Sequence, residues 1–148
     1  MKKIWIMCLL VLFIAVGCGN NDTKEFDLSK VSNELQKTDL FPSAEVVDLD
    51  YLQSKYGLSL DGIKDASIYM ALTARKASMY AIFEVENDEA RNNIKNAFID
   101  KYVFSWTNMV YDAYEADLVN NMHSESYGNY EIYVISSDND KALEIIKG

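Results

Sequence analysis

Two stretches in which apolar and polar residues alternate stand in the middle of the chain. The first covers Ala66 to Thr73 and puts three apolar side chains on one face: Ile68, Met70 and Leu72. The second covers Met79 to Val85 and puts four on one face: Met79, Ala81, Phe83 and Val85. A period of two is typical of a half-buried strand. Because the linker Ala74 to Ser78 is short, the pattern predicts an antiparallel hairpin.

A second hairpin is indicated near the end of the chain, by the sequence Tyr127-Gly128-Asn129-Tyr130. Gly128-Asn129 suits a tight two-residue turn that needs a positive φ angle. Tyr130 to Ser136 follows the turn and is rich in β-branched and aromatic residues. Such a composition predicts a strand.

Two segments before the first hairpin have the apolar spacing of helices. The first takes Asp27 as its N-cap and runs to about Lys37, before Phe41-Pro42 ends it, because proline cannot continue a helix. The second covers Asp48 to Tyr56, where Gly57 can supply a left-handed C-cap.

Two further helices are predicted after the first hairpin. One starts with Asn87-Asp88 as its N-cap and runs on, bent or broken, to Tyr114. The other covers Asp138 to Lys147 and can lay its apolar residues over a sheet. The order of elements predicts an α+β fold, with an antiparallel sheet of about four strands in two hairpins and helices mainly on one face.

The first seventeen residues have the pattern of a secretory signal. Lys2 and Lys3 precede an apolar run from Ile4 to Val16 that is too short to span a bilayer easily. The run ends in Ala15-Val16-Gly17-Cys18, which resembles a bacterial lipobox except that Ala15 stands where leucine is usual. We predict a lipoprotein signal peptide over residues 1–17 and lipidation at Cys18. The alternatives are a plain signal peptide that ends near a cysteine, and a signal anchor.

The remaining chain divides into a short tether and one domain. Residues 18–25 comprise the lipidated cysteine and a polar tether, and residues 26–148 form a single domain. Removing residues 1–17 leaves 131 of the 148 residues. Because two of the removed residues are lysines, the formal net charge changes from −9 to −11. This acidity, without a basic run, argues against nucleic acid as a partner. With Cys8 removed and Cys18 acylated, the hydrophobic core must hold the fold without disulfides.

The order of these motifs is similar to that of a known family. The resemblance covers about residues 26–147 and rests on the lipobox, Phe41-Pro42, Tyr56-Gly57-Leu58, the hairpin from Ala71 to Phe83, and Tyr127-Gly128-Asn129-Tyr130 leading to Val134-Ile135-Ser136. The chain resembles the DUF4358 lipoproteins of bacteria, mainly Firmicutes, whose function is unknown. It departs from them at Tyr114-Glu115-Ala116, where the family often has Tyr-x-Pro. The resemblance implies an envelope lipoprotein and carries over no catalytic residue.

Candidates for active-site or metal chemistry are few. His123 is the single histidine, lies in a polar stretch and is expected to be solvated on an edge strand or loop. The pairs Asp48/Asp50 and Asp138/Asp140 could offer oxygen ligands to Ca²⁺, but helix capping explains them better. No hydrolase, zinc-protease, P-loop or dinucleotide-binding motif is present in the sequence. We predict no catalytic residue, no metal site and no cofactor.

Tyrosine is the less ordinary feature, with ten in the chain. If Ile68, Phe83 and Val134 point inward, alternation puts Tyr69, Tyr80 and Tyr133 together on the other side of the sheet as a candidate binding face. The alternative, which we favour, is cross-strand pairing of tyrosines or cover by the first helix. The aromatic stretch from Tyr102 to Tyr114 could likewise be a docking surface, but is more often core.

These features predict a lipoprotein anchored on the outer face of the bacterial cytoplasmic membrane. Its expected role is a binding or interaction module for an extracellular ligand or an envelope protein. The alternative is an accessory or assembly subunit of an envelope complex, and an enzyme is the least expected class.

Overall fold

The computed structural model describes residues 25–108 and 112–148. The predicted signal peptide, Cys18 and the tether up to Lys24 lie outside the described residues. The helical segments are α1 (Leu28–Leu35), α2 (Leu49–Tyr56), α3 (Asp88–Asn93), the π-helical η1 (Ile94–Ile99), α4 (Asp100–Asn108), α5 (Ala113–Asn120) and α6 (Asn139–Lys147). The strands are β1 (Ala44–Val47), β2 (Ile63–Ala71), β3 (Met79–Val85), β4 (His123–Tyr127) and β5 (Tyr130–Ile135).

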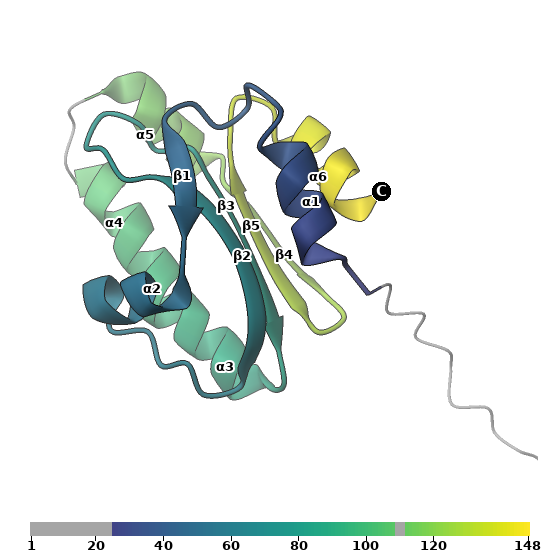
Figure 1. Cartoon of the computed structure of the whole chain (residues 1–148). Helices are drawn as coiled ribbons and strands as arrows, with labels where there is room; N and C mark the ends of the chain where they lie inside the picture. Colours follow the sequence, from purple (N-terminus) through teal and green to yellow (C-terminus); the bar gives the residue numbers. More distant parts are fainter. Residues whose placement is uncertain (1–24, 109–111) are drawn as a thin grey trace, which may run out of the picture.

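The strands form one antiparallel sheet in the order β1-β2-β3-β5-β4 (Figure 1). The α+β class and both predicted hairpins, β2–β3 and β4–β5, are confirmed. The sequence did not predict β1, which adds a fifth strand at one edge. Its four residues do not alternate between buried and exposed, and Val46 is 67% exposed, so the period of two is missing.

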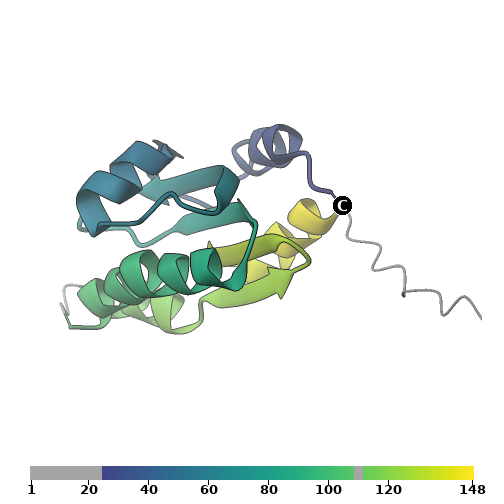
Figure 2. The same cartoon turned by 90° about the horizontal axis from the view of Figure 1, so that it is seen from below.

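Helices cover both faces of the sheet rather than mainly one (Figures 1 and 2). On one face α1 and α6 pack over Tyr80, Ile82, Ile132 and Val134. On the other face α2, the run α3–η1–α4 and α5 pack over Met79, Ala81, Phe83 and Ile135. The central strands β3 and β5 are therefore buried on both sides, which is why their residues are apolar at nearly every position rather than at alternate ones.

Local capping sets the helix boundaries that the sequence predicted. The carboxylates of Asp27, Asp48 and Asp138 each accept a hydrogen bond from a backbone N–H three residues on, and the side-chain oxygen of Asn87 does the same. Gly57 closes α2 with a φ of 74°, in the left-handed region. Asp48 and Asp138 thus act as helix caps, as expected.

The third predicted helix is interrupted, as its aromatic pattern allowed. A π-helical stretch, η1, joins α3 to α4, and a new helix, α5, begins after Asp112, whose carboxylate accepts from the N–H groups of Tyr114 and Glu115. Among the described residues, no helix has both the length and the apolar character needed to cross a membrane.

Candidate binding site

The three tyrosines proposed as one binding face do not share a face of the sheet. Tyr69 pairs with Tyr80 across β2 and β3, and their rings stack 5.7 Å apart. Tyr133 pairs with Ala81, so it points to the opposite face, and Val134 takes the place beside Tyr80. The prediction of a common face is wrong because alternation within a strand says nothing about the register between strands.

Helices and loops also cover these tyrosines. Tyr80 has an exposed fraction of 0%, and its hydroxyl donates a hydrogen bond of 3.0 Å to Ser32 Oγ of α1. Tyr133 is 3% exposed beneath the other helical layer, and burial raises the pKa of its hydroxyl. Tyr69 alone is half-buried. The favoured alternative, cross-strand pairing and cover by the first helix, describes Tyr69 and Tyr80, whereas Tyr133 is covered by the helices of the other face.

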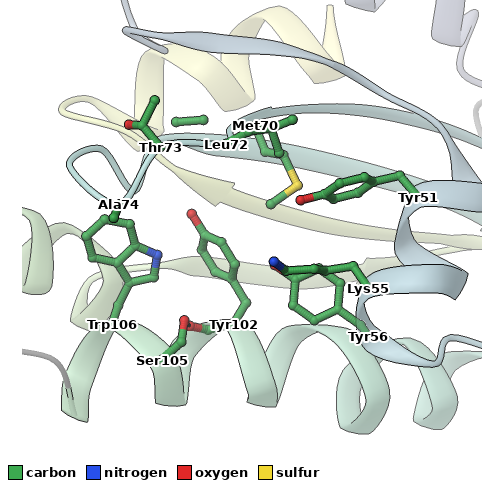
Figure 3. Close-up of a pocket in the computed structure, with 11 residues that line it drawn as sticks. Tyr51, Lys55, Tyr56, Met70, Leu72, Thr73, Ala74, Tyr102, Ser105 and Trp106 are labelled. Carbon is green, nitrogen blue, oxygen red and sulfur yellow. Dashed lines mark hydrogen bonds between the residues drawn. The ribbon is translucent and has the colours of Figure 1, made fainter.

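A cleft on the face opposite α1 offers a different site. It lies between α2, the end of β2 with the loop after it, and α4, and has a volume of about 310 Å³ (Figure 3). Its lining consists of Tyr51, Lys55, Tyr56, Met70, Ala71, Leu72, Thr73, Ala74, Tyr102, Ser105 and Trp106. The volume falls at the small end of the range of about 300–1,000 Å³ typical of ligand pockets.

Helical spacing brings the aromatic groups to the cleft from two sides. On α4, Tyr102, Ser105 and Trp106 are three and four residues apart, which places them on one face of the helix. On α2, Tyr51 and Lys55 are four residues apart, and both project into the cleft (Figure 3). The rings of Tyr102 and Trp106 lie 6.4 Å apart at an interplanar angle of 56°, so they form one aromatic wall.

Leu72 belongs to the cleft rather than to the sheet. The sequence pattern placed it on the inward face of the first strand with Ile68 and Met70, but β2 ends at Ala71. Leu72 therefore lies in the loop, 41% exposed, and lines the cleft.

Two helices of the cleft are tied together behind its aromatic wall. Lys101 Nζ donates a hydrogen bond of 2.7 Å to the backbone carbonyl of Tyr56, which links α4 to the end of α2. The ring of Tyr56 also packs 5.0 Å from that of Phe98 on η1. Burial, followed by the influence of Tyr51, raises the pKa of the Tyr56 hydroxyl to about 12. This hydroxyl is therefore a neutral hydrogen-bond donor at any physiological pH.

The loop between β2 and β3, which borders the cleft, is held through both backbone polar groups of one residue, Ala77. Its N–H donates a 2.8 Å hydrogen bond to Glu115 Oε2, while its carbonyl accepts one of 3.1 Å from the Tyr102 hydroxyl. Glu115 is 1% exposed, and its other oxygen pairs with Lys76 Nζ at 2.8 Å. Burial raises the pKa of Tyr102, which keeps its hydroxyl protonated and able to donate. The cleft is therefore largely pre-formed.

Several polar groups that face the cleft have no hydrogen-bond or ion-pair partner among the described residues. Within residues 25–108 and 112–148, Lys55 makes no ion pair, and the hydroxyls of Tyr51 and Tyr56 make no hydrogen bond. These groups are available to a ligand. Sequence reasoning missed this cleft, although Tyr102 and Trp106 lie in the aromatic stretch that it singled out. Helical spacing could have grouped Tyr51 with Lys55, but no sequence signal joined them to α4.

His123 lies on the edge strand β4, as the sequence predicted. It is half-exposed, and its Nε2 lies 3.0 Å from a carboxylate oxygen of Glu125, which Lys147 also contacts. The hydrogen bonds from Lys147 and His123 lower the pKa of Glu125. In the part of the chain that the structure describes, no three His, Cys, Asp or Glu side chains gather as a group that could hold a metal ion.

The fold and the cleft define a small α+β domain with a single sheet between two helical layers and one aromatic cleft beside the sheet. A model of the family DUF4358, a domain of unknown function, matches residues 36–136. This span exceeds half of the chain, so the protein belongs to the DUF4358 family, as the resemblance implied. All the residues that line the cleft lie within it. No curated protein and no solved structure matches the chain.

Proposed function

We propose that this protein is a lipid-anchored, extracytoplasmic binding protein whose aromatic cleft takes a small ligand. The observation that carries the proposal is the cleft itself, which combines a pre-formed aromatic wall with polar groups that have no partner among the described residues. Aromatic walls with a few convergent polar atoms are the usual composition of a ligand site.

The chemistry of the lining favours binding over catalysis. None of the residues that line the cleft carries a carboxylate, an imidazole or a thiol. A pair of groups that could exchange protons would therefore have to be built from Lys55 and hydroxyl groups, and Tyr56 is held neutral by its raised pKa. Recognition needs only the stacking surface and the hydrogen-bond donors that are present.

The anchor and the location are proposed from the sequence. The basic, apolar and small-residue pattern of residues 1–18 supports a lipid on Cys18, and two acyl chains would hold the domain at the membrane. The residues between Cys18 and Phe26 can span at most about 25 Å. The described chain enters the domain at α1, whereas the cleft lies on the opposite face of the sheet (Figure 1). This geometry supports a cleft that stays accessible while the protein is anchored.

The test uses the full chain in detergent and ligand-observed NMR with a library of small cyclic metabolites. Ser105→Phe adds a ring at an exposed cleft position and should block binding, whereas Asn92→Phe adds the same ring at an exposed position of α3 outside the cleft. We expect library hits to bind the wild type and Asn92→Phe but not Ser105→Phe. Hits that bind Ser105→Phe equally well, or a library without hits, would overturn the cleft as a ligand site.

An accessory subunit of an envelope complex is the second candidate, and one exposed side chain favours it. Phe104 on α4 is 66% exposed and borders a shallow hollow that includes Ile99, Val103 and Met122. Large exposed aromatic residues are enriched at protein interfaces. An envelope protein that copurifies with the wild-type chain, but not with Phe104→Ser, would favour this candidate.

A further inference from the structure

We propose that the ligand of the cleft is a small anion that carries an apolar ring, such as an aromatic carboxylate. This inference rests on the proposed function, because it names the chemical class that the same cleft would bind. It is carried by the charge of the lining, the geometry of the aromatic wall and the kind of hydrogen-bonding groups that point inward.

The lining of the cleft is positively charged, although the chain as a whole is acidic. The sequence has 23 acidic and 14 basic residues, yet none of the residues that line the cleft is acidic. Lys55 is the only charged residue among them, and its amine points into the cleft (Figure 3). Lys55 is an exposed residue, so solvent reaches its amine in the empty cleft, and a ligand that fills the cleft would displace part of that solvent and strengthen the attraction.

A second cation stands next to the cleft, beyond Ala74. Ala74 also borders an adjoining hollow that Arg75, Lys76 and Asp112 line. Lys76 is occupied by the buried carboxylate of Glu115, but Arg75 forms no ion pair within the described ranges. Although Asp112 offsets part of this charge, its side chain caps α5 by accepting two backbone N–H groups. Arg75 and Lys76 together balance the charges of Asp112 and Glu115, so this side of the cleft adds no net repulsion against an anion.

The polar groups of the lining can all donate hydrogen bonds to one acceptor. The Lys55 ammonium has three donor hydrogens and no acceptor, and the hydroxyls of Tyr51 and Tyr56, which can also accept, can each donate one. Tyr56 stays protonated because its pKa is raised to about 12. A carboxylate, which only accepts hydrogen bonds, complements such a set better than an ammonium or a neutral amide does.

The apolar part of the ligand is indicated by the aromatic and aliphatic side chains of the lining. The rings of Tyr102 and Trp106 border the cleft from α4, and the side chain of Met70 borders it from β2 (Figure 3). A flat ring can lie against this surface with its anionic group toward α2. A volume of about 310 Å³ is sufficient for a one-ring compound.

The test exploits the position of Trp106 in the cleft. The chain has two tryptophans, Trp5 and Trp106, so in the full-length variant Trp5→Phe all tryptophan emission comes from the cleft. Phenylacetate, 2-phenylethanol and phenethylamine share one ring but carry an anionic, a neutral and a cationic group. We expect phenylacetate to bind about tenfold more tightly than 2-phenylethanol, because only phenylacetate can form a charge-assisted hydrogen bond with Lys55. Phenethylamine, which carries a positive charge, should bind most weakly.

Two further variants assign the preference to one side chain. Lys55→Gln should abolish the preference for phenylacetate while 2-phenylethanol still binds, whereas Lys37→Gln, an exposed lysine after α1, should leave it unchanged. Equal binding of all three probes, or a preference that survives Lys55→Gln, would overturn the anionic class and leave the cleft as a binding site. If no probe binds at millimolar concentration, the anionic ring class is also overturned, and the library experiment with Ser105→Phe then decides the proposed function separately.

Discussion

At the scale of single residues, one buried carboxylate organises the wall of the cleft. Glu115 reaches from α5 to the loop between β2 and β3 and accepts hydrogen bonds from both Lys76 and the Ala77 N–H. The charge-assisted hydrogen bond from the buried Ala77 N–H contributes about 1.5–3 kcal/mol. The carbonyl of the same residue, Ala77, accepts a hydrogen bond from the hydroxyl of Tyr102, a residue of the cleft. Stability of the loop and shape of the cleft therefore depend on the same atoms.

Replacing Glu115 tests this dependence. We expect Glu115→Gln to lower the free energy of unfolding by about 1–3 kcal/mol, because the amide loses the charge that both bonds use. Glu34→Gln is the matched control. Glu34 is exposed, and its carboxylate oxygen Oε1 lies 4.0 Å from Lys30 Nζ, so it also faces a lysine but forms only a loose surface ion pair. The control should change stability by less than about 0.5 kcal/mol. Urea denaturation measures both, and equal effects of the two substitutions would contradict a structural role for Glu115.

At the scale of elements, the turn between β4 and β5 is the most constrained local feature. Tyr127 pairs with Tyr130, so only Gly128 and Asn129 form the loop, and Gly128 has a φ of 58°. Neighbouring segments hold this turn: Arg91 donates a hydrogen bond to the Gly128 carbonyl, and the Val85 N–H donates one of 2.8 Å to the Asn129 carbonyl. The turn is therefore both strained for other residues and anchored to α3 and β3.

Gly128→Val should destabilise the domain by more than about 1 kcal/mol, because a β-branched side chain resists positive φ. Ser126→Val introduces the same side chain at an exposed position of β4, where valine suits a strand, and should be close to neutral. Thermal melts of the two variants provide the comparison. An unchanged midpoint for Gly128→Val would mean that the turn tolerates a negative φ.

At the scale of the whole molecule, the family match and the hydrophobic cores have different extents. The DUF4358 match runs from Gln36 to Ser136 and includes all five strands, whereas α1 and α6 lie outside it. These two helices nevertheless bury one face of the sheet, including Tyr80 and Ile132. A fragment limited to the matched residues would expose that apolar face to water. The physical domain is therefore longer than the matched span, and α1 is its first element after the proposed anchor and tether.

The anchor is tested at the same scale by fatty-acid labelling of whole cells. Cys18→Ser should abolish incorporation of labelled fatty acid, because the diacylglyceryl group needs a thiol at that position. Cys8→Ser removes the chain's other cysteine and should keep the label. Label that persists in Cys18→Ser would contradict the lipoprotein proposal.

The sequence by itself determined the features that depend on neighbouring residues. Helix caps at Asp27, Asp48 and Asp138 and the turn at Gly128 are interactions within a few positions, so the residue types suffice to predict them. The two hairpins follow for the same reason, since a short connection leaves adjacent strands little choice but to pair.

Only the tertiary structure decided which residues meet across the fold. The face of Tyr133 depends on the register of β5 against β3, where Ala81 lies opposite it, and a shift of one residue would reverse that face. The strand β1 is defined by the pairing of its backbone with β2. Its four side chains do not alternate between buried and exposed, so the sequence holds no pattern that would predict the strand. The cleft likewise joins Lys55 of α2 to Trp106 of α4 through the packing of two helices on one sheet. Such contacts are set by the combined burial of distant segments, which no local pattern encodes.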